Sequence, residues 1–208
     1  MSANRLDMVD TFDQFGHDHW KALGTKLGGV ETVKALLRGT STVTIEVIRR
    51  LTALTSVTVE TDNVNLRDFF KTREGLWVSS NFDDLILKGV SKKNHSAKET
   101  VIGRADLAQA ANDAEIGAEL PEGYVFEGVV TFLVHLATLI KEQWGGKDGV
   151  LLNNGYANSF YVKVNGEVFV VLVRWHADAR EWYCYAGRLY DCRWVAGYRA
   201  FSATATLA

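Results

Sequence analysis

Hydrophobic residues first repeat at helical spacing along the chain. Trp20, Leu23 and Leu27 share one helical face ahead of Gly28, and glycine is a typical helix end. This pattern predicts one helix here and a second, shorter helix in VETVKALLRG. The period then changes to two in STVTIEVIRR and LTSVTVET, which predicts two strands rich in Val, Ile and Thr.

Three short elements follow before residue 90. Asn65 is placed to cap a helix in NLRDFFKT, LWVSS predicts a short strand, and NFDDLILKG predicts an amphipathic helix. The polar and charged segment VSKKNHSAK is typical of a linker or mobile loop. We therefore expect residues 1–90 to form a mixed α/β unit.

A long buried helix is predicted over residues 126–144, FEGVVTFLVHLATLIKEQW. Apolar residues surround most of its circumference, as expected for a helix that is packed on several sides. His135 lies on this helix, and we interpret it as a core histidine whose hydrogen bonds are satisfied. The acidic stretch before it begins on a further predicted helix, DLAQAANDAEI, and is interpreted as a solvated face.

The last third of the chain alternates like an antiparallel β-meander. Asn165-Gly166 separates two alternating runs and predicts a two-residue hairpin turn, because both turn residues need positive φ. EWYCYAG and RWVAGYRAFS predict two further strands. Helices first and a meander afterwards indicate the α+β class. We expect one domain over residues 1–208, with two lobes, 1–90 and 100–208, as the alternative.

Composition and charge mainly exclude classes of function. The chain has 208 residues, 47% hydrophobic and 23% charged, with a net charge of −2, so no bulk attraction to nucleic acid or membranes is expected. The N-terminus shows no signal-peptide core and the longest apolar stretch is too short to span a bilayer, which predicts a cytoplasmic protein. Two cysteines without metal-ligand spacing are interpreted as reduced thiols.

The segment VRWHADAREWYCYAGRLYDCRW concentrates the candidate binding residues. Alternation turns Trp175 and Trp182 inward, whereas tyrosines and arginines are left for the opposite side. Tyr, Trp and Arg are enriched at binding hot spots. We therefore expect a non-enzymatic module that binds a protein partner or a second copy of itself, with these binding residues: Arg174, Tyr183, Tyr185, Arg188 and Tyr190. The competing interpretation is a sheet face that simply packs against a helix.

Two other functions stay open. The same aromatic face, together with Lys92, Lys93 and Lys98, would suit single-stranded nucleic acid, since bases stack on aromatic rings and cations contact phosphates.

An enzyme is the second alternative, although the common nucleotide-binding, hydrolase and metalloprotease motifs are absent. Its candidate catalytic residues are His176, Asp178 and Cys184, a possible thiol, imidazole and carboxylate set. His17 and His19 are candidate metal ligands, but residues two apart on a helix do not share a face. We predict no cofactor.

Two stretches carry a resemblance to other proteins. LGGVETVKALLRG near the N-terminus, and the region from FLVHLATLIKEQWGGKDGVLLNNGYANSFYVKVNG to GYRAFS, resemble a group of short uncharacterised bacterial proteins. The resemblance implies a bacterial cytoplasmic setting and implies no activity, cofactor or site.

Overall fold

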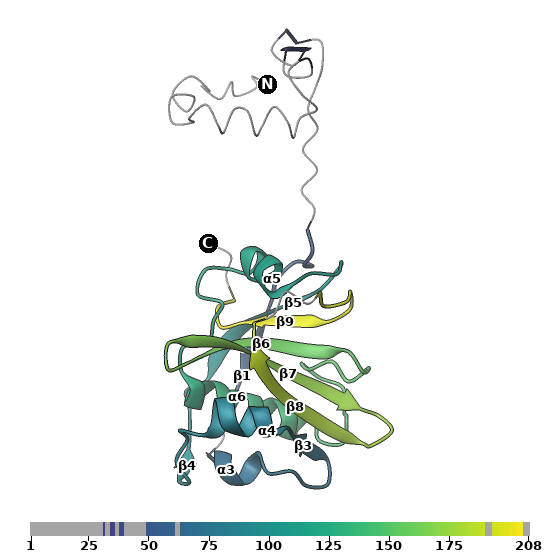
Figure 1. Cartoon of the computed structure of the whole chain (residues 1–208). Coiled ribbons are helices and arrows are strands. Elements are labelled where there is room, and N and C mark those ends of the chain that lie inside the picture. The colour runs from purple at the N-terminus through teal and green to yellow at the C-terminus, as the bar shows by residue number, and fades with distance from the viewer. Residues whose placement is uncertain are drawn as a thin grey trace. The chain divides into compact units, whose positions relative to one another are not determined.

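The computed structural model describes residues 31, 34, 35, 38, 39, 49–60, 63–189 and 193–205 (Figure 1). The chain divides into two compact units, residues 1–48 and 49–208. In the first unit, Glu31, Lys34 and Ala35 are helical, and Lys34 forms an ion pair with Glu31 at 2.8 Å. The helices predicted before residue 30 and the strand predicted over residues 41–48 lie outside the described residues.

The described residues of the second unit form nine strands, one long helix and several short helical segments. Their bounds are β1 (Thr55–Val59), β2 (Val64–Asn65), α3 (Leu66–Phe69), β3 (Leu76–Val78), α4 (Ser80–Phe82), the π-helical segment η2 (Asp83–Leu87), β4 (Asn94–His95), β5 (Thr100–Asp106), α5 (Asp113–Glu119), α6 (Val129–Glu142), β6 (Ala157–Val164), β7 (Glu167–His176), β8 (Glu181–Arg188) and β9 (Arg199–Ser202).

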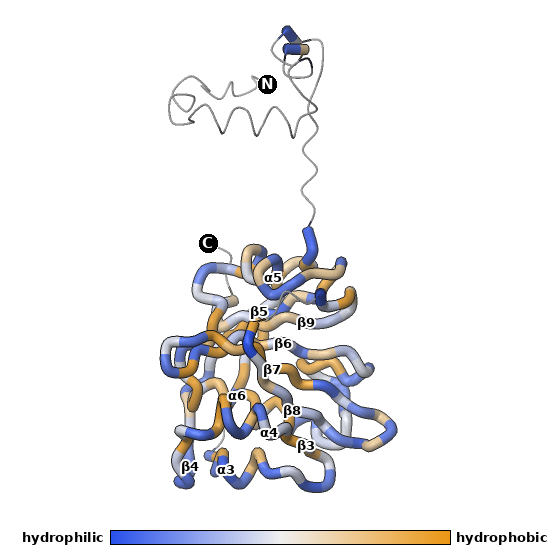
Figure 2. The backbone as a smooth tube through the Cα atoms, in the orientation of Figure 1, coloured by the Kyte–Doolittle hydropathy of each residue, from blue (hydrophilic) through white to orange (hydrophobic). Residues whose placement is uncertain are grey.

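Seven of the strands form one sheet in the order β1-β5-β9-β6-β7-β8-β3. β6, β7 and β8 pair antiparallel in sequence order, and Asn165 and Gly166 connect β6 to β7 with φ angles of 52° and 86°. The fold is α+β, with a large sheet to which the C-terminal strands contribute. Figure 2 shows hydrophobic residues concentrated along these strands and α6.

The C-terminal strands are not a simple meander. β9 does not pair with β8, but lies between β5 and β6, antiparallel to the first and parallel to the second. Arg199 stabilises this position, because its guanidinium donates to both carboxylate oxygens of Asp106 at 2.6 and 3.0 Å and to the Val150 carbonyl at 2.8 Å. These contacts are with residues about fifty and ninety positions away, which alternation along one strand cannot predict.

The predicted division between residues 90 and 100 is not seen in the sheet. β1 and β3 come from the first predicted lobe, yet β1 pairs with β5 and β3 pairs with β8. A strand needs a partner for its backbone groups, and these two strands find theirs in the second predicted lobe, residues 100–208. Strands from both predicted lobes therefore share the seven-stranded sheet and its main core, while β2 and β4 form a separate two-stranded sheet.

The two faces of the sheet are covered by different elements. One face packs on α6, where Phe160, Trp182 and Phe201 belong to the large core cluster. The outer face carries a second, smaller cluster that includes Ile116 of α5 and Tyr161 of β6. α6 begins at Val129, three residues later than the predicted range, and nine consecutive residues from Phe132 to Ile140 are buried.

Asp113 fixes α5 on the outer face. This buried carboxylate accepts hydrogen bonds from the Tyr161 hydroxyl at 3.0 Å and from the Trp194 indole at 2.8 Å. Burial, and then the nearby Asp113 charge, raise the pKa of Tyr161 far above its ordinary value. Asn112 caps the helix in a reciprocal capping box with Glu115. α5 is thus attached over β6 and the segment that precedes β9 rather than over β8.

Gln143 organises the loop that follows α6. Its side chain is buried, donates to the carbonyls of Lys147 and Leu151 at 2.9 Å each, and accepts from the Leu151 amide at 2.6 Å. The backbone carbonyl of Gln143 accepts a hydrogen bond from the Trp182 indole at 3.0 Å. The Gln143 side chain thus connects the end of α6 to the return loop, and the Gln143 backbone carbonyl connects it to β8.

We expect Gln143→Ala to destabilise the fold by about 3 kcal/mol, because the buried amide and carbonyl of Leu151 would lose their partners. The free energy of unfolding in urea measures this. Glu142→Ala, one position earlier and exposed, is the control and should change the value by less than about 0.5 kcal/mol. Equal effects of the two substitutions would contradict this role of Gln143.

Candidate functional site

Four aromatic rings lie together on the outer face of the sheet, at the end that carries β7, β8 and β3. We call His176, Tyr183, Tyr185 and Trp77 the aromatic platform. Alternation brings them to this face, because Tyr183 and Tyr185 flank the buried Cys184, and Trp77 lies between Leu76 and Val78, which point to the core side. The platform thus combines rings from three strands.

The rings are in contact with one another. The His176 and Tyr183 rings stack with centroids 4.5 Å apart and an interplanar angle of 22°. The Trp77 ring lies 5.0 Å from that of Tyr183 and 5.1 Å from that of Tyr185. Such separations are those of favourable aromatic pairs. The cluster is therefore a continuous surface rather than a set of isolated rings.

Register places Arg174 at the border of the platform. Arg174 is the cross-strand partner of Tyr183, and Trp77 is the partner of Tyr183 on its other side. Partial burial, and then the neighbouring Tyr183, raise the pKa of Tyr185, whereas the charge of Arg174 opposes this shift. A cation thus acts on the phenol from the neighbouring strand.

The platform is the part of the outer face that α5 does not cover. The α5 cluster reaches Leu172 on β7, and beyond it Arg174 is exposed and Tyr185 retains 37% of its surface. Within residues 49–60, 63–189 and 193–205, no segment buries Tyr185. Among the described residues, the competing interpretation, a tyrosine and arginine face packed beneath a helix, applies to the α5 half of this face.

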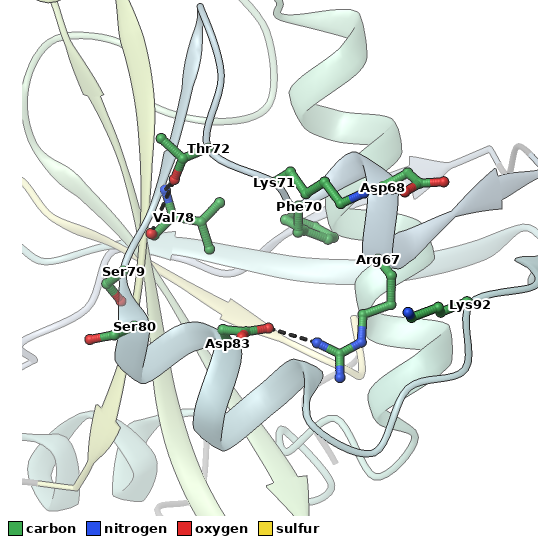
Figure 3. Close-up of a pocket in the computed structure, with 10 residues that line it drawn as sticks. All are labelled: Arg67, Asp68, Phe70, Lys71, Thr72, Val78, Ser79, Ser80, Asp83 and Lys92. Carbon is green, nitrogen blue, oxygen red and sulfur yellow. Dashed lines mark hydrogen bonds and ion pairs between the residues drawn. The ribbon is translucent and has the colours of Figure 1, made fainter.

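The free edge of β3 is closed by its own chain. The amide and carbonyl of Leu76 bond to the backbone of Arg73 at 2.9 and 2.8 Å. The Thr72 hydroxyl accepts from the Val78 amide at 3.0 Å and donates to the Val78 carbonyl at 3.3 Å (Figure 3). Arg73 itself is held against the rings of Phe69 and Trp144. An added strand would find these edge groups occupied.

Arg188 does not join the platform, although we expected it to. It follows Cys184 and Ala186 on the other side of β8, where it lies over the Phe169 ring and pairs with Glu167. The reason is the period of two, which gives residues 184, 186 and 188 the same face. Tyr190 lies outside the described residues.

The candidate catalytic set is not assembled. Cys184 is fully buried on the core side, whereas His176 lies on the outer face and Asp178 is in the exposed turn between β7 and β8. Burial raises the pKa of the Cys184 thiol well above its ordinary value. A nucleophilic thiolate needs the opposite shift. His176 instead stacks on Tyr183.

The other candidate ligands and cations lie elsewhere. His17 and His19 are outside the described residues. Where the structure describes the chain, no group of three His, Cys, Asp or Glu side chains could hold a metal ion. The Lys92 carbonyl accepts from the Asn65 side chain at the start of α3 at 2.6 Å, and Lys92 lines a pocket there.

That pocket, of about 1020 Å³, lies between α3 and α4 (Figure 3). Its charged groups are largely paired with each other: Arg67 with Asp83 at 2.7 Å, and Lys71 with Asp68 at 2.6 Å. Arg67 also donates to the carbonyls of Lys88 and Val90. These bonds hold the end of η2 against α3. We therefore interpret the pocket as the structural boundary at which the two segments are held together, and not as a ligand site.

His135 is buried on α6 as expected, but only one of its two ring nitrogens has a hydrogen-bond partner. Nε2 bonds to the Lys98 carbonyl at 3.1 Å, and Nδ1 is buried without a hydrogen-bond partner. Desolvation lowers the pKa of this imidazole. Burial therefore favours the neutral form of the ring, which belongs to the core.

Sequence reasoning missed Trp77 as a platform residue. The run LWVSS predicts a strand, and alternation along it already turns Trp77 to the face opposite to that of Leu76 and Val78. Its partner strand lies more than a hundred residues later in the chain, and the pairing is parallel. The short-range pattern contains no signal for that choice.

Comparison with known proteins found no matching family model, no matching curated protein and no matching solved structure. The resemblance to short bacterial proteins and the cytoplasmic setting therefore stay predictions. None of the helices in the described part of the chain has the length and apolar character needed to cross a bilayer.

We expect Thr72→Val to open the β3 edge, because the Val78 amide and carbonyl would lose the hydroxyl that occupies them. Hydrogen exchange at the Val78 amide should accelerate at least about tenfold, as for loss of a bond worth about 1.4 kcal/mol. Thr72→Ser keeps the hydroxyl and should retain slow exchange. Equal exchange rates in the valine and serine variants would contradict closure of the edge by Thr72.

Proposed function

We propose that the chain is a protein-binding module whose binding surface is the aromatic platform with Arg174 at its border. One observation carries the proposal: rings from three strands form a continuous surface that the described residues leave partly exposed, most of all at Tyr185. Exposed aromatic clusters of this kind are characteristic of interaction sites.

The chemistry of the border favours protein over nucleic acid. Arg174 provides a cation on this face, and Glu181, the partner of His176, provides an anion. A strand of phosphates requires a row of cations, whereas Lys92 lines the pocket between α3 and α4. A protein surface with hydroxyl, carboxylate and apolar groups suits this mixture better.

The partner is expected to dock on the face and not to extend the sheet at β3. Face docking places side chains against the rings, whereas strand addition needs free amides and carbonyls at the edge. Arg73 and Thr72 occupy those groups. The affinity for the partner should therefore depend on the area that the Tyr and Trp rings bury, since these side chains are large and rigid.

We expect Tyr183→Ala/Tyr185→Ala to weaken partner binding at least about tenfold, since central aromatic residues contribute about 2 kcal/mol each. The measurement is affinity capture with the full chain, followed by titration calorimetry with the captured and purified partner. Arg188→Ala is the matched control, because Arg188 is on the same strand and faces the other way. It should bind as the unmodified chain does.

Circular dichroism and urea unfolding first establish that each variant is folded. Unchanged partner affinity in the double tyrosine variant would overturn the proposal. A mobility shift with single-stranded oligonucleotides, lost in the double variant and falling steeply with salt, would replace it with nucleic-acid binding.

A further inference from the structure

We infer that β1, at the edge of the sheet opposite to β3, pairs antiparallel with β1 of a second copy of this chain. This surface is separate from the aromatic platform, and the inference does not rest on the proposed function. It starts from the contrast between the two sheet edges. β3 is closed by Thr72 and Arg73, whereas β1 has β5 as its strand partner in the described chain.

Hydrogen-bond directions show which groups of β1 face outward. The amide and carbonyl of Leu107 bond to residues 198 and 197, on the β9 side. Backbone groups alternate in direction along a strand, so residues 100, 102, 104 and 106 face β1. In agreement, the Asp106 carbonyl accepts from the Thr52 amide at 2.8 Å.

The register then assigns the free groups to Ser56 and Thr58. Thr55, Val57 and Val59 are opposite Arg104, Ile102 and Thr100, and these are the bonded pairs. Ser56 and Thr58 alternate with them and direct their amides and carbonyls away from β5. Both residues are exposed. They offer two donors and two acceptors in a row.

The sequence of β1 contains none of the residues that usually protect an edge strand from pairing. Natural sheets protect edge strands with lysine, proline, inward charges or bulges, because unpaired backbone groups invite another strand. β1 reads TSVTV and contains no charge and no proline. Two neutral strands can approach each other without electrostatic repulsion, which is why the occupant we infer is a second copy.

Self-pairing is geometrically consistent when Val57 lies at the twofold axis. Ser56 of one copy is then opposite Thr58 of the other, and the four outward backbone groups of each strand are satisfied reciprocally. Val57 packs on the core cluster but stays partly exposed at the edge. Contact with the partner's Val57 would cover the rest of it, and β-branched cross-strand pairs are favourable.

The test is sedimentation velocity of the full chain over a dilution series. The unmodified chain should dimerise reversibly. In Ser56→Lys/Thr58→Lys, each lysine faces a lysine of the other copy, so the dissociation constant should rise at least about tenfold. Ser56→Glu/Thr58→Glu should behave in the same way. An equimolar mixture of the two variants should restore a dimer, because each lysine then faces a glutamate.

Ala177→Lys/Ala179→Lys is the matched control. It adds the same charge at exposed positions of the turn between β7 and β8, far from β1 in the strand order, and should leave dimerisation unchanged. A chain that stays monomeric throughout the series would overturn the inference. A dimer that resists the β1 lysines but dissociates in Tyr183→Ala/Tyr185→Ala would overturn it too, by assigning self-association to the platform.

Discussion

The parallel pairing of β3 with β8 determines what is buried and what is exposed at one end of the molecule. It sets Leu76 and Val78 against the core and Trp77 beside Tyr183 and Tyr185. It also positions the preceding loop so that Thr72 and Arg73 can occupy the outer edge of β3. Without this pairing β8 would itself be an edge strand, and the platform would lose its largest ring.

The sheet is covered unequally on its two faces. Seven strands at about 4.8 Å spacing make a sheet about 29 Å wide, whereas the seven residues of α5 form a helix about 10 Å long. One short helix held by Asp113 can therefore cover only part of the outer face. The part that α5 leaves open is the end that carries the aromatic platform and Arg174.

The two edges of the sheet also differ in whether their outward backbone groups are hydrogen-bonded. β3 is closed by a hydroxyl and a backbone bridge, and β1 is a neutral strand whose outward groups belong to Ser56 and Thr58. Pairing of two copies at β1 would keep both outer faces on the same side of one continuous sheet. Two platforms would then lie at its far ends, an arrangement that suits a partner with two binding sites.

Local patterns predicted much of this fold. The α+β class was confirmed, and the cap at Asn65, the strand at Leu76–Val78 and the facing of Tyr183 follow from short-range spacing. Pairings between distant segments could not be predicted in this way. The insertion of β9 beside β5 depends on Arg199 meeting Asp106, and Trp77 reaches the platform through a partner 106 residues later.

The placement of Arg188 shows a different limit. Composition grouped it with Arg174 and the tyrosines, although the parity of its position already assigns it to the other side of β8. Here the alternation rule was sufficient and residue type misled the interpretation. Site predictions on strands are therefore better made from parity first and from residue chemistry second.

The central claim is that the rings of the platform face outward and stay accessible to solvent in the full chain, above all at Tyr185. Hydroxyl-radical footprinting of the monomeric full chain, read out by mass spectrometry, tests it most directly at Tyr185. The account predicts rapid oxidation of Tyr185 and strong protection of Tyr161 and Trp182, which are fully buried. Protection of Tyr185 equal to that of Tyr161 would contradict it.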